Sequence, residues 1–112
     1  MAASESLLRR VRAALDHVPR VQEKRMFSGI TFMVNGKMCI SVGPHRLMCR
    51  IDPDIHETAV KRTGARTVRM KGRQYIGYVY VDEEALGAKK DFDYWVRLCL
   101  DFNTKAKSSR KR

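Results

Sequence analysis

The dipeptide Asn35-Gly36 lies between two apolar runs of strand length, and it constrains the fold more than any other feature of the chain. Asn-Gly is typical of the tight turns that join antiparallel strands, because both residues tolerate positive φ angles. The flanking runs, residues 30–34 and 37–42, are rich in the apolar and β-branched residues that strands favour. The sequence therefore predicts a β-hairpin near the centre of the fold.

The apolar pattern also bears on the register of this hairpin. A strict two-residue loop would place Phe32 opposite Cys39 and scatter the apolar side chains over both faces. A three-residue loop that ends in a left-handed Gly36 would instead place Phe32 opposite Met38. Because register follows the buried face, we expect the three-residue, bulged turn.

Capping residues and hydrophobic periodicity predict the other elements. We expect a first helix that begins after Ser4 and ends before Pro19, a short helix begun by Asp52, and a last helix capped by Asp91. Further strands are expected over residues 21–27, 46–51, 65–70 and 74–81. Strands that follow one another on short turns indicate an antiparallel sheet. The expected fold is α+β, with about six strands in the order α-β-β-β-β-α-β-β-α and the helices packed on one face.

The loop before residues 46–51 should contain an even number of residues, since that register buries Leu47, Cys49 and Ile51. Cys39 then faces away from the core and cannot form a disulfide with Cys49. The opposite face of the sheet would carry basic and sulphur-containing side chains: Thr31, Met33, Lys37, Cys39, Ser41, Arg46, Met48 and Arg50.

The charge of the chain is unusually positive for 112 residues, at a formal net +11. Five of the 23 Lys and Arg residues lie in residues 105–112, which we expect to be a disordered basic tail after a single domain over residues 1–104. No apolar run is long enough to cross a bilayer. Three cysteines without a CxxC pair are typical of a reduced, cytoplasmic protein. The three histidines lack metal-ligand spacing, so no metal, cofactor or catalytic site is expected.

Two strings carry a family resemblance: residues 23–30 (EKRMFSGI) and residues 32–38 (FMVNGKM). With the later pieces LMCRI (47–51), GYVYVD (77–82) and Trp95-Val96, they resemble the N-terminal domain of the TfoX/Sxy family of bacterial competence regulators. The sequence is identified as a single-domain member. The resemblance implies an α+β domain like that of YjbR-like proteins, kinship with regulators that act with the cyclic-AMP receptor protein, and no catalytic residues.

The expected function is therefore non-enzymatic interaction. The leading hypothesis is binding of a protein partner, such as a transcription factor, or of a second copy of the chain. The residues expected to bind the partner are Met33, Lys37, Arg46, Met48 and Arg50. An ordinary solvated face remains an alternative reading of this surface. The other functional hypothesis is direct electrostatic binding of nucleic acid through the tail and through Arg9, Arg10, Arg12, Lys71 and Arg73.

Overall fold

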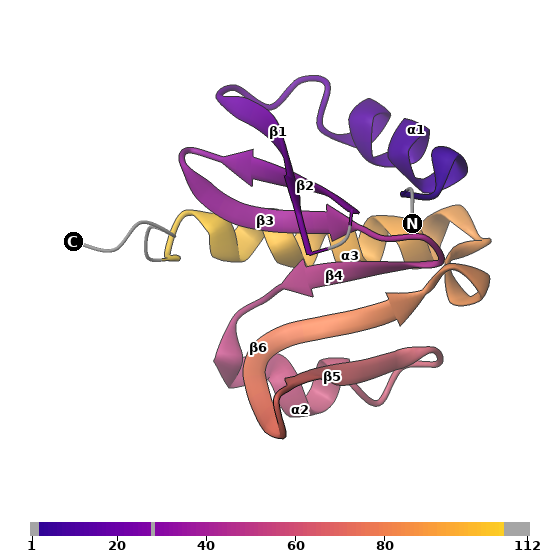
Figure 1. Cartoon of the computed structure of the whole chain (residues 1–112), viewed down its shortest axis with the longest axis vertical. Helices are drawn as coiled ribbons and strands as arrows, with labels where there is room; N and C mark the ends of the chain where they lie inside the picture. Colours follow the sequence, from indigo (N-terminus) through magenta and orange to yellow (C-terminus); the bar gives the residue numbers. More distant parts are fainter. Residues whose placement is uncertain (1–2, 28, 107–112) are drawn as a thin grey trace.

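Six antiparallel strands form one sheet, and the helices lie against one of its faces (Figure 1). The computed structural model describes residues 3–27 and 29–106. The strands are β1 (Val21–Met26), β2 (Gly29–Val34), β3 (Lys37–Val42), β4 (Arg46–Arg50), β5 (Ala65–Met70) and β6 (Arg73–Asp82). The helices are α1 (Glu5–Ala14), α2 (His56–Ala59) and α3 (Lys89–Asn103), with 3₁₀ turns η1 (Pro53–Ile55) and η2 (Glu83–Leu86). The expected α+β fold is confirmed.

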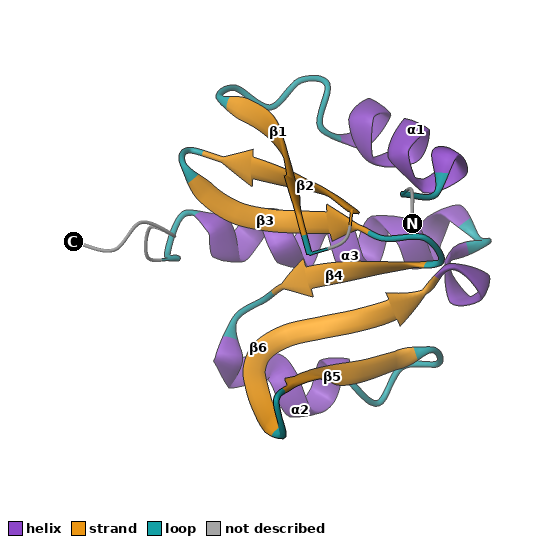
Figure 2. Cartoon of the chain, viewed as in Figure 1, coloured by secondary structure: helices purple, strands orange, loops and turns teal. Residues whose placement is uncertain are grey.

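The strand order is β1-β2-β3-β4-β6-β5, so the chain leaves β4, passes through η1 and α2 to the sheet edge, and returns beside β4 as β6 (Figure 2). The main core lies between the sheet and the helices. Leu7 and Val11 of α1 and Trp95 of α3 are buried there with Phe32 and Leu47 of the sheet. Burial of this apolar stripe, rather than helix propensity alone, stabilises α1 and α3.

The helix ends differ in part from expectation. The Ser4 hydroxyl caps α1 as predicted, accepting a hydrogen bond from the Leu7 N–H at 3.3 Å. Asp52 likewise accepts from the Asp54 N–H at 2.9 Å. The prediction that Asp91 caps α3 is wrong, because the N-cap residue is Ala88 and Asp91 lies in the first turn. The Asp91 carboxylate pairs with a guanidinium from the turn after α2 instead of with the backbone.

The β2–β3 hairpin closes with a two-residue turn, in which Asn35 has φ 56° and Gly36 has φ 76°. Val34 pairs with Lys37, which contradicts the expected three-residue loop. The extra residue lies further along β3, where the register shifts and Phe32 pairs with Ile40. A β-bulge can sit anywhere in a ladder, so the apolar pattern demands one additional residue without specifying its position.

The β3–β4 connection confirms the expected even loop. Val42 pairs with Leu47 and Ile40 with Cys49, and all four side chains are buried in the main core. The alternation of apolar residues along β4 therefore predicts correctly which of its side chains face the helices.

Strand β6 bends sharply at Gly77, which has φ +96° (Figure 2). His56, buried at the start of α2, fixes this bend. Its Nδ1 accepts the Gly77 N–H at 2.9 Å, so its Nε2 carries the proton and donates to the Thr67 hydroxyl at 2.8 Å. The buried imidazole thus joins α2, β5 and β6, a structural role that its spacing in the sequence does not reveal.

The chain remains packed on the domain beyond residue 104. Lys105 places its Nζ 3.3 Å from an Asp52 carboxylate oxygen, and Ala106 is buried. The sequence predicts that the disordered tail begins at residue 105, whereas Lys105 and Ala106 contact the domain. The rest of the expected tail, residues 107–112, lies outside the described residues. Within the described ranges, none of the helices combines the length and hydropathy that a bilayer crossing requires.

Candidate partner-binding face

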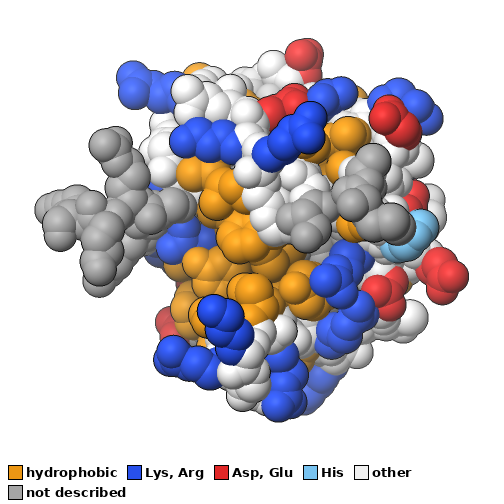
Figure 3. Space-filling view, viewed as in Figure 1, with side chains coloured by type: hydrophobic (Ala, Val, Ile, Leu, Met, Phe, Trp, Pro, Cys, Tyr) orange, Lys and Arg blue, Asp and Glu red, His pale blue; other side chains and the backbone are white. Residues whose placement is uncertain are grey.

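The face of the sheet opposite the helices carries a second cluster of apolar side chains. Its buried members are Met33, Met38, Met48 and Val68, and its half-buried members are Met26, Met70, Tyr75, Tyr78 and Tyr80. We call these nine residues the methionine–tyrosine face. Figure 3 shows hydrophobic side chains gathered over the middle of this face, with Lys and Arg side chains around them.

The methionines of this face are less accessible than the sequence suggested. Met33 is only 5% exposed and Met48 only 3% exposed, although no helix covers either residue. Between neighbouring residues of β2 and β3, the Thr31 hydroxyl donates to the Ser41 hydroxyl at 2.9 Å, so these two buried polar groups are paired. Half-buried side chains of the same face, which include the three tyrosines, pack against the methionines. The expected orientation of Met33 and Met48 is confirmed, but their expected exposure is wrong.

Arginine side chains lie over the tyrosine rings at the rim of this face. The Arg46 guanidinium is 3.6 Å from the centre of the Tyr80 ring, and that of Arg66 is 5.6 Å away. Arg66 also pairs with Asp82 at 2.8 Å. Arg50 lies 5.7 Å from the Tyr78 ring. Such cation–π contacts hold the guanidinium groups in place without using their hydrogen-bond donors.

A hollow of about 190 Å³ opens in the same face. It is lined by Phe27, Ser41, Gly43, Pro44, Arg46, Met48, Met70 and Tyr80. Phe27 follows β1 and is 46% exposed, whereas Met70 ends β5, so the two edge strands of the sheet converge on one hollow. The hollow is smaller than the roughly 300–1,000 Å³ of small-molecule sites and is of a size for one apolar side chain.

Two residues expected on this face lie on the other side of the sheet. Lys37 extends along the helix side, where its Nζ donates to the Asn103 carbonyl at the end of α3 at 3.0 Å. Cys39 is buried in the main core. The reason is the bulge in β3: its extra residue turns Cys39 towards the same side as Ile40, and the two-residue turn places Lys37 opposite the core residue Val34.

The three cysteines meet in the main core as free thiols. Cys99 of α3 interacts with both Cys39 of β3 and Cys49 of β4. The hydrogen bond with Cys99, and then burial, raises the pKa of Cys39 far above its ordinary value. Burial is the main cause that raises the pKa of Cys99. These thiols are therefore inert core groups rather than nucleophiles, since reactivity requires the thiolate.

The residues of the nucleic-acid hypothesis do not form one surface. Arg10 lies 4.3 Å from the Phe92 ring, and Arg12 makes two 2.8 Å hydrogen bonds to Glu23. This pair lowers the pKa of Glu23 and raises that of Arg12. Lys71 and Arg73 flank the β5–β6 turn, at the opposite end of the molecule from α1 (Figure 1). Arg9 is exposed on α1 with no ion pair within the described ranges.

Nothing in residues 3–27 and 29–106 gathers three or more His, Cys, Asp or Glu side chains into a metal site. The sequence does not single out Phe27, Arg66 and Met70 as residues of this face, nor the tyrosines Tyr75, Tyr78 and Tyr80. The alternation of Tyr78 and Tyr80 on β6 was the available signal, because residues of one parity share a face. Their pairing with Arg50 and Met48 depends on β6 lying beside β4.

The chain matches the model of the TfoX N-terminal domain over residues 13–103. It matches no curated protein and no solved structure with significance. The matched segment begins within α1, contains all six strands and ends at the last residue of α3. The chain belongs to the TfoX N-terminal domain family, a regulatory class of domain rather than a known class of enzyme.

Proposed function

We propose that this chain is a non-enzymatic regulatory module that binds an acidic segment of a protein partner through the methionine–tyrosine face. Kinship with competence regulators makes a transcription factor the favoured class of partner. The observation that carries the proposal is the hollow beside Arg46, where an apolar site adjoins a guanidinium held over Tyr80. An apolar side chain next to a carboxylate is the complementary chemistry.

Charge complementarity favours an acidic occupant. The chain carries a formal net charge of +11, which attracts acidic partners over long range and raises association rates. Met, Tyr and Arg are also the residues that concentrate at protein interfaces. Arg46 and Arg50 form no ion pair within the described ranges, so both remain available to carboxylates.

The test uses capture of partners on the immobilised chain from lysate of the source cell, followed by direct measurement of the affinity for the captured protein. Reversing two rim charges, Arg46→Glu with Arg50→Glu, should weaken that affinity by about tenfold or more. Both side chains are partly exposed, so the thermal unfolding midpoint should stay close to that of the unchanged chain.

The matched control is Arg9→Glu with Arg97→Glu, which reverses two exposed charges on α1 and α3, on the other side of the sheet. It changes the net charge by the same amount but should leave the affinity within about twofold, because long-range attraction between exposed charges is screened by salt. Equal weakening by both changes would reject a localised face. Loss of a dimer, seen by sedimentation, would identify the occupant as a second copy of the chain.

A further inference from the structure

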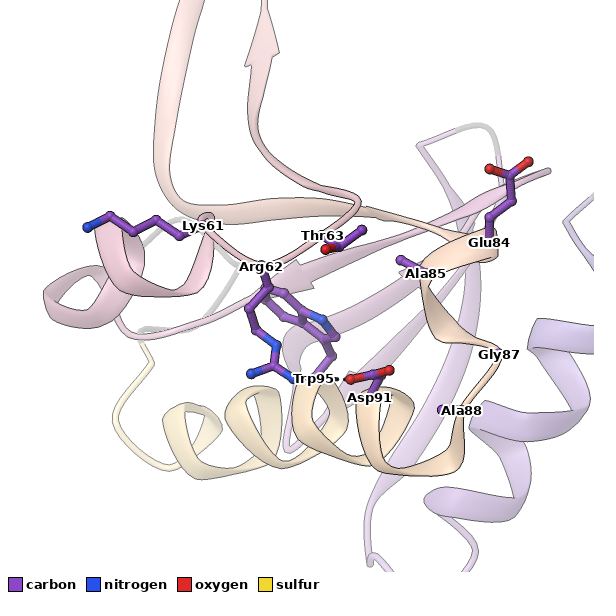
Figure 4. A pocket seen from close by; sticks show the side chains of 9 residues that line it. All are labelled: Lys61, Arg62, Thr63, Glu84, Ala85, Gly87, Ala88, Asp91 and Trp95. Atoms are coloured by element: carbon purple, nitrogen blue, oxygen red, sulfur yellow. Dashed lines mark hydrogen bonds and ion pairs between the residues drawn. The ribbon is translucent and has the colours of Figure 1, made fainter.

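A separate cleft of about 500 Å³ lies on the helix side of the molecule, between the turn after α2 and the segment that leads into α3 (Figure 4). Its lining residues are Lys61, Arg62, Thr63, Glu84, Ala85, Gly87, Ala88, Asp91 and Trp95. The volume lies within the range of small-molecule binding sites. This cleft does not overlap the methionine–tyrosine face, and the proposed function does not use it.

Trp95 lies on α3 at the base of this cleft and is the only tryptophan of the chain. The side chain is buried, with 1% of the residue exposed. Its indole N–H donates to no acceptor in the described residues, where every fully buried side-chain N or O atom has a partner. The indole N–H must therefore belong to the small exposed surface of Trp95, which faces the cleft that this residue lines. A buried tryptophan N–H usually has a partner, so this free donor points to an acceptor from outside the chain.

Arg62 lines the same cleft and supplies further donors (Figure 4). Its guanidinium is held in two ways: Nη2 donates to Asp91 at 3.1 Å, and the group lies 3.7 Å from the centre of the Tyr94 ring. A guanidinium has five N–H donors, and Asp91 accepts from one of them. The remaining donors are thus pre-positioned for another acceptor at little cost in conformational entropy.

The charged groups of the lining differ between the two ends of the cleft. Lys61 lies at the Arg62 end, where its ammonium group points away from the other lining side chains, and the Thr63 hydroxyl adds a donor there (Figure 4). Glu84 lies at the opposite end of the cleft from Lys61 (Figure 4). The N-cap residue of α3, Ala88, supplies no side-chain cap, and Asp91 in the first turn places a carboxylate near the positive end of the helix dipole. An anion is therefore expected at the Arg62 end of the cleft.

We infer that this cleft binds a small molecule through an oxyanion group, a carboxylate or a phosphate, which accepts from the Trp95 indole N–H and from Arg62. The indole N–H supplies the uncharged, directional hydrogen bond of this site. The Arg62 guanidinium supplies the charge, and Asp91 with Tyr94 positions it.

Nuclear magnetic resonance of the ¹⁵N-labelled full chain tests this inference directly, because a single tryptophan gives a single indole N–H signal. The probes are succinate, inorganic phosphate and succinamide, the neutral counterpart of succinate, each at constant ionic strength. One or both anions should shift the indole signal saturably, with a dissociation constant of about 1 mM or tighter. Saturation by succinate alone indicates a carboxylate ligand, and saturation by phosphate alone a phosphate ligand.

Arg62→Gln should weaken the binding of the effective anion by about tenfold, since it removes charge-assisted hydrogen bonds. The variant should fold, because the Arg62–Asp91 pair is partly exposed and such pairs add little stability. The matched control is Arg69→Gln, at an exposed position of β5, which should leave the affinity unchanged. Three results would overturn the inference: an indole signal that saturates with neither anion, one that responds equally to succinamide, or an anion affinity that Arg62→Gln leaves unchanged.

Discussion

Glycine is required at position 29 by the backbone of the neighbouring strand. A Cβ atom there would overlap the carbonyl oxygen of Val42, a backbone group that cannot rotate away. Gly29 also begins β2, within the string that carries the family resemblance. The presence of glycine is thus explained by close approach of two strands rather than by a positive φ angle.

Gly29→Ala should lower the free energy of unfolding by about 2 kcal/mol or more, since the added methyl group forces two strands apart. Urea unfolding followed by circular dichroism measures this change. The matched control is Gly87→Ala, where nothing lies within 4 Å of the added Cβ and φ is −62°. That change should leave stability unaltered or raise it by about 0.5 kcal/mol. Similar losses in both variants would contradict the explanation by close approach.

Individual residues show where sequence reasoning succeeds and where it stops. Alternation along β4 correctly separates Leu47 and Cys49 from Arg46 and Met48. The burial of Met48 does not follow from that alternation, because it depends on side chains from other strands that pack beside it. The free indole N–H of Trp95 is likewise invisible in the sequence, where a helical apolar stripe predicts only a core residue.

At the scale of elements, α3 packs against the sheet through its apolar stripe, within which Cys99 contacts Cys39 and Cys49. The sequence predicts the amphipathic stripe of α3 and the turns between strands, since these rest on local patterns. It does not predict the position of the bulge in β3, which decides that Cys39 rather than Met38 faces α3. That choice rests on packing between elements that are distant in the chain.

The cysteine cluster predicts a pH dependence of stability. Folding raises the pKa of Cys39 and Cys99 above the ordinary thiol value of 9.0, so the folded state retains protons that the unfolded state releases. The stabilisation is fully present below pH 9 and declines as the pH rises above it. The free energy of unfolding should fall by about 1.4 kcal/mol per pH unit for each thiol. Urea unfolding between pH 8 and pH 10, with a reductant present, measures the slope.

The control for this prediction is the double variant Cys39→Ala with Cys99→Ala. It removes both thiols but keeps the tyrosines and lysines that also titrate in alkali. Its unfolding free energy should be lower at every pH but should vary less steeply above pH 9. Identical slopes in the two proteins would show that the cluster does not contribute.

At the scale of the whole molecule, the positive charge does not form one continuous surface. Some basic side chains are neutralised by ion pairs, and other basic groups lie far apart. Arg12, Arg62, Arg66, Lys89 and Lys105 form ion pairs within the described residues. The basic groups at α1 and at the β5–β6 turn lie at opposite ends of the molecule. Duplex DNA presents its phosphates along one continuous backbone, which suits a continuous basic surface. The distribution of charge in this chain therefore favours an acidic protein segment over nucleic acid as the partner.

Removal of residues 107–112 tests this distribution, since it deletes four positive charges and keeps the buried Ala106. We expect the shortened chain to bind duplex DNA at least about tenfold more weakly than the full chain in low salt. The slope of log affinity against log salt should also become shallower by up to about 3.6. Fluorescence anisotropy with a labelled duplex measures both quantities. An unchanged affinity would show that the folded body itself binds DNA.

The additional residue in β3 marks a position where the length of this strand can change without altering which side chains face the core. Loss of Cys39, the residue that the bulge adds, would leave Met33 paired with Met38 and Phe32 paired with Ile40, so the ladder would become regular and every other side chain would keep its face. Related chains that are one residue shorter at this position should therefore keep the same fold and lack only the thiol that contacts Cys99.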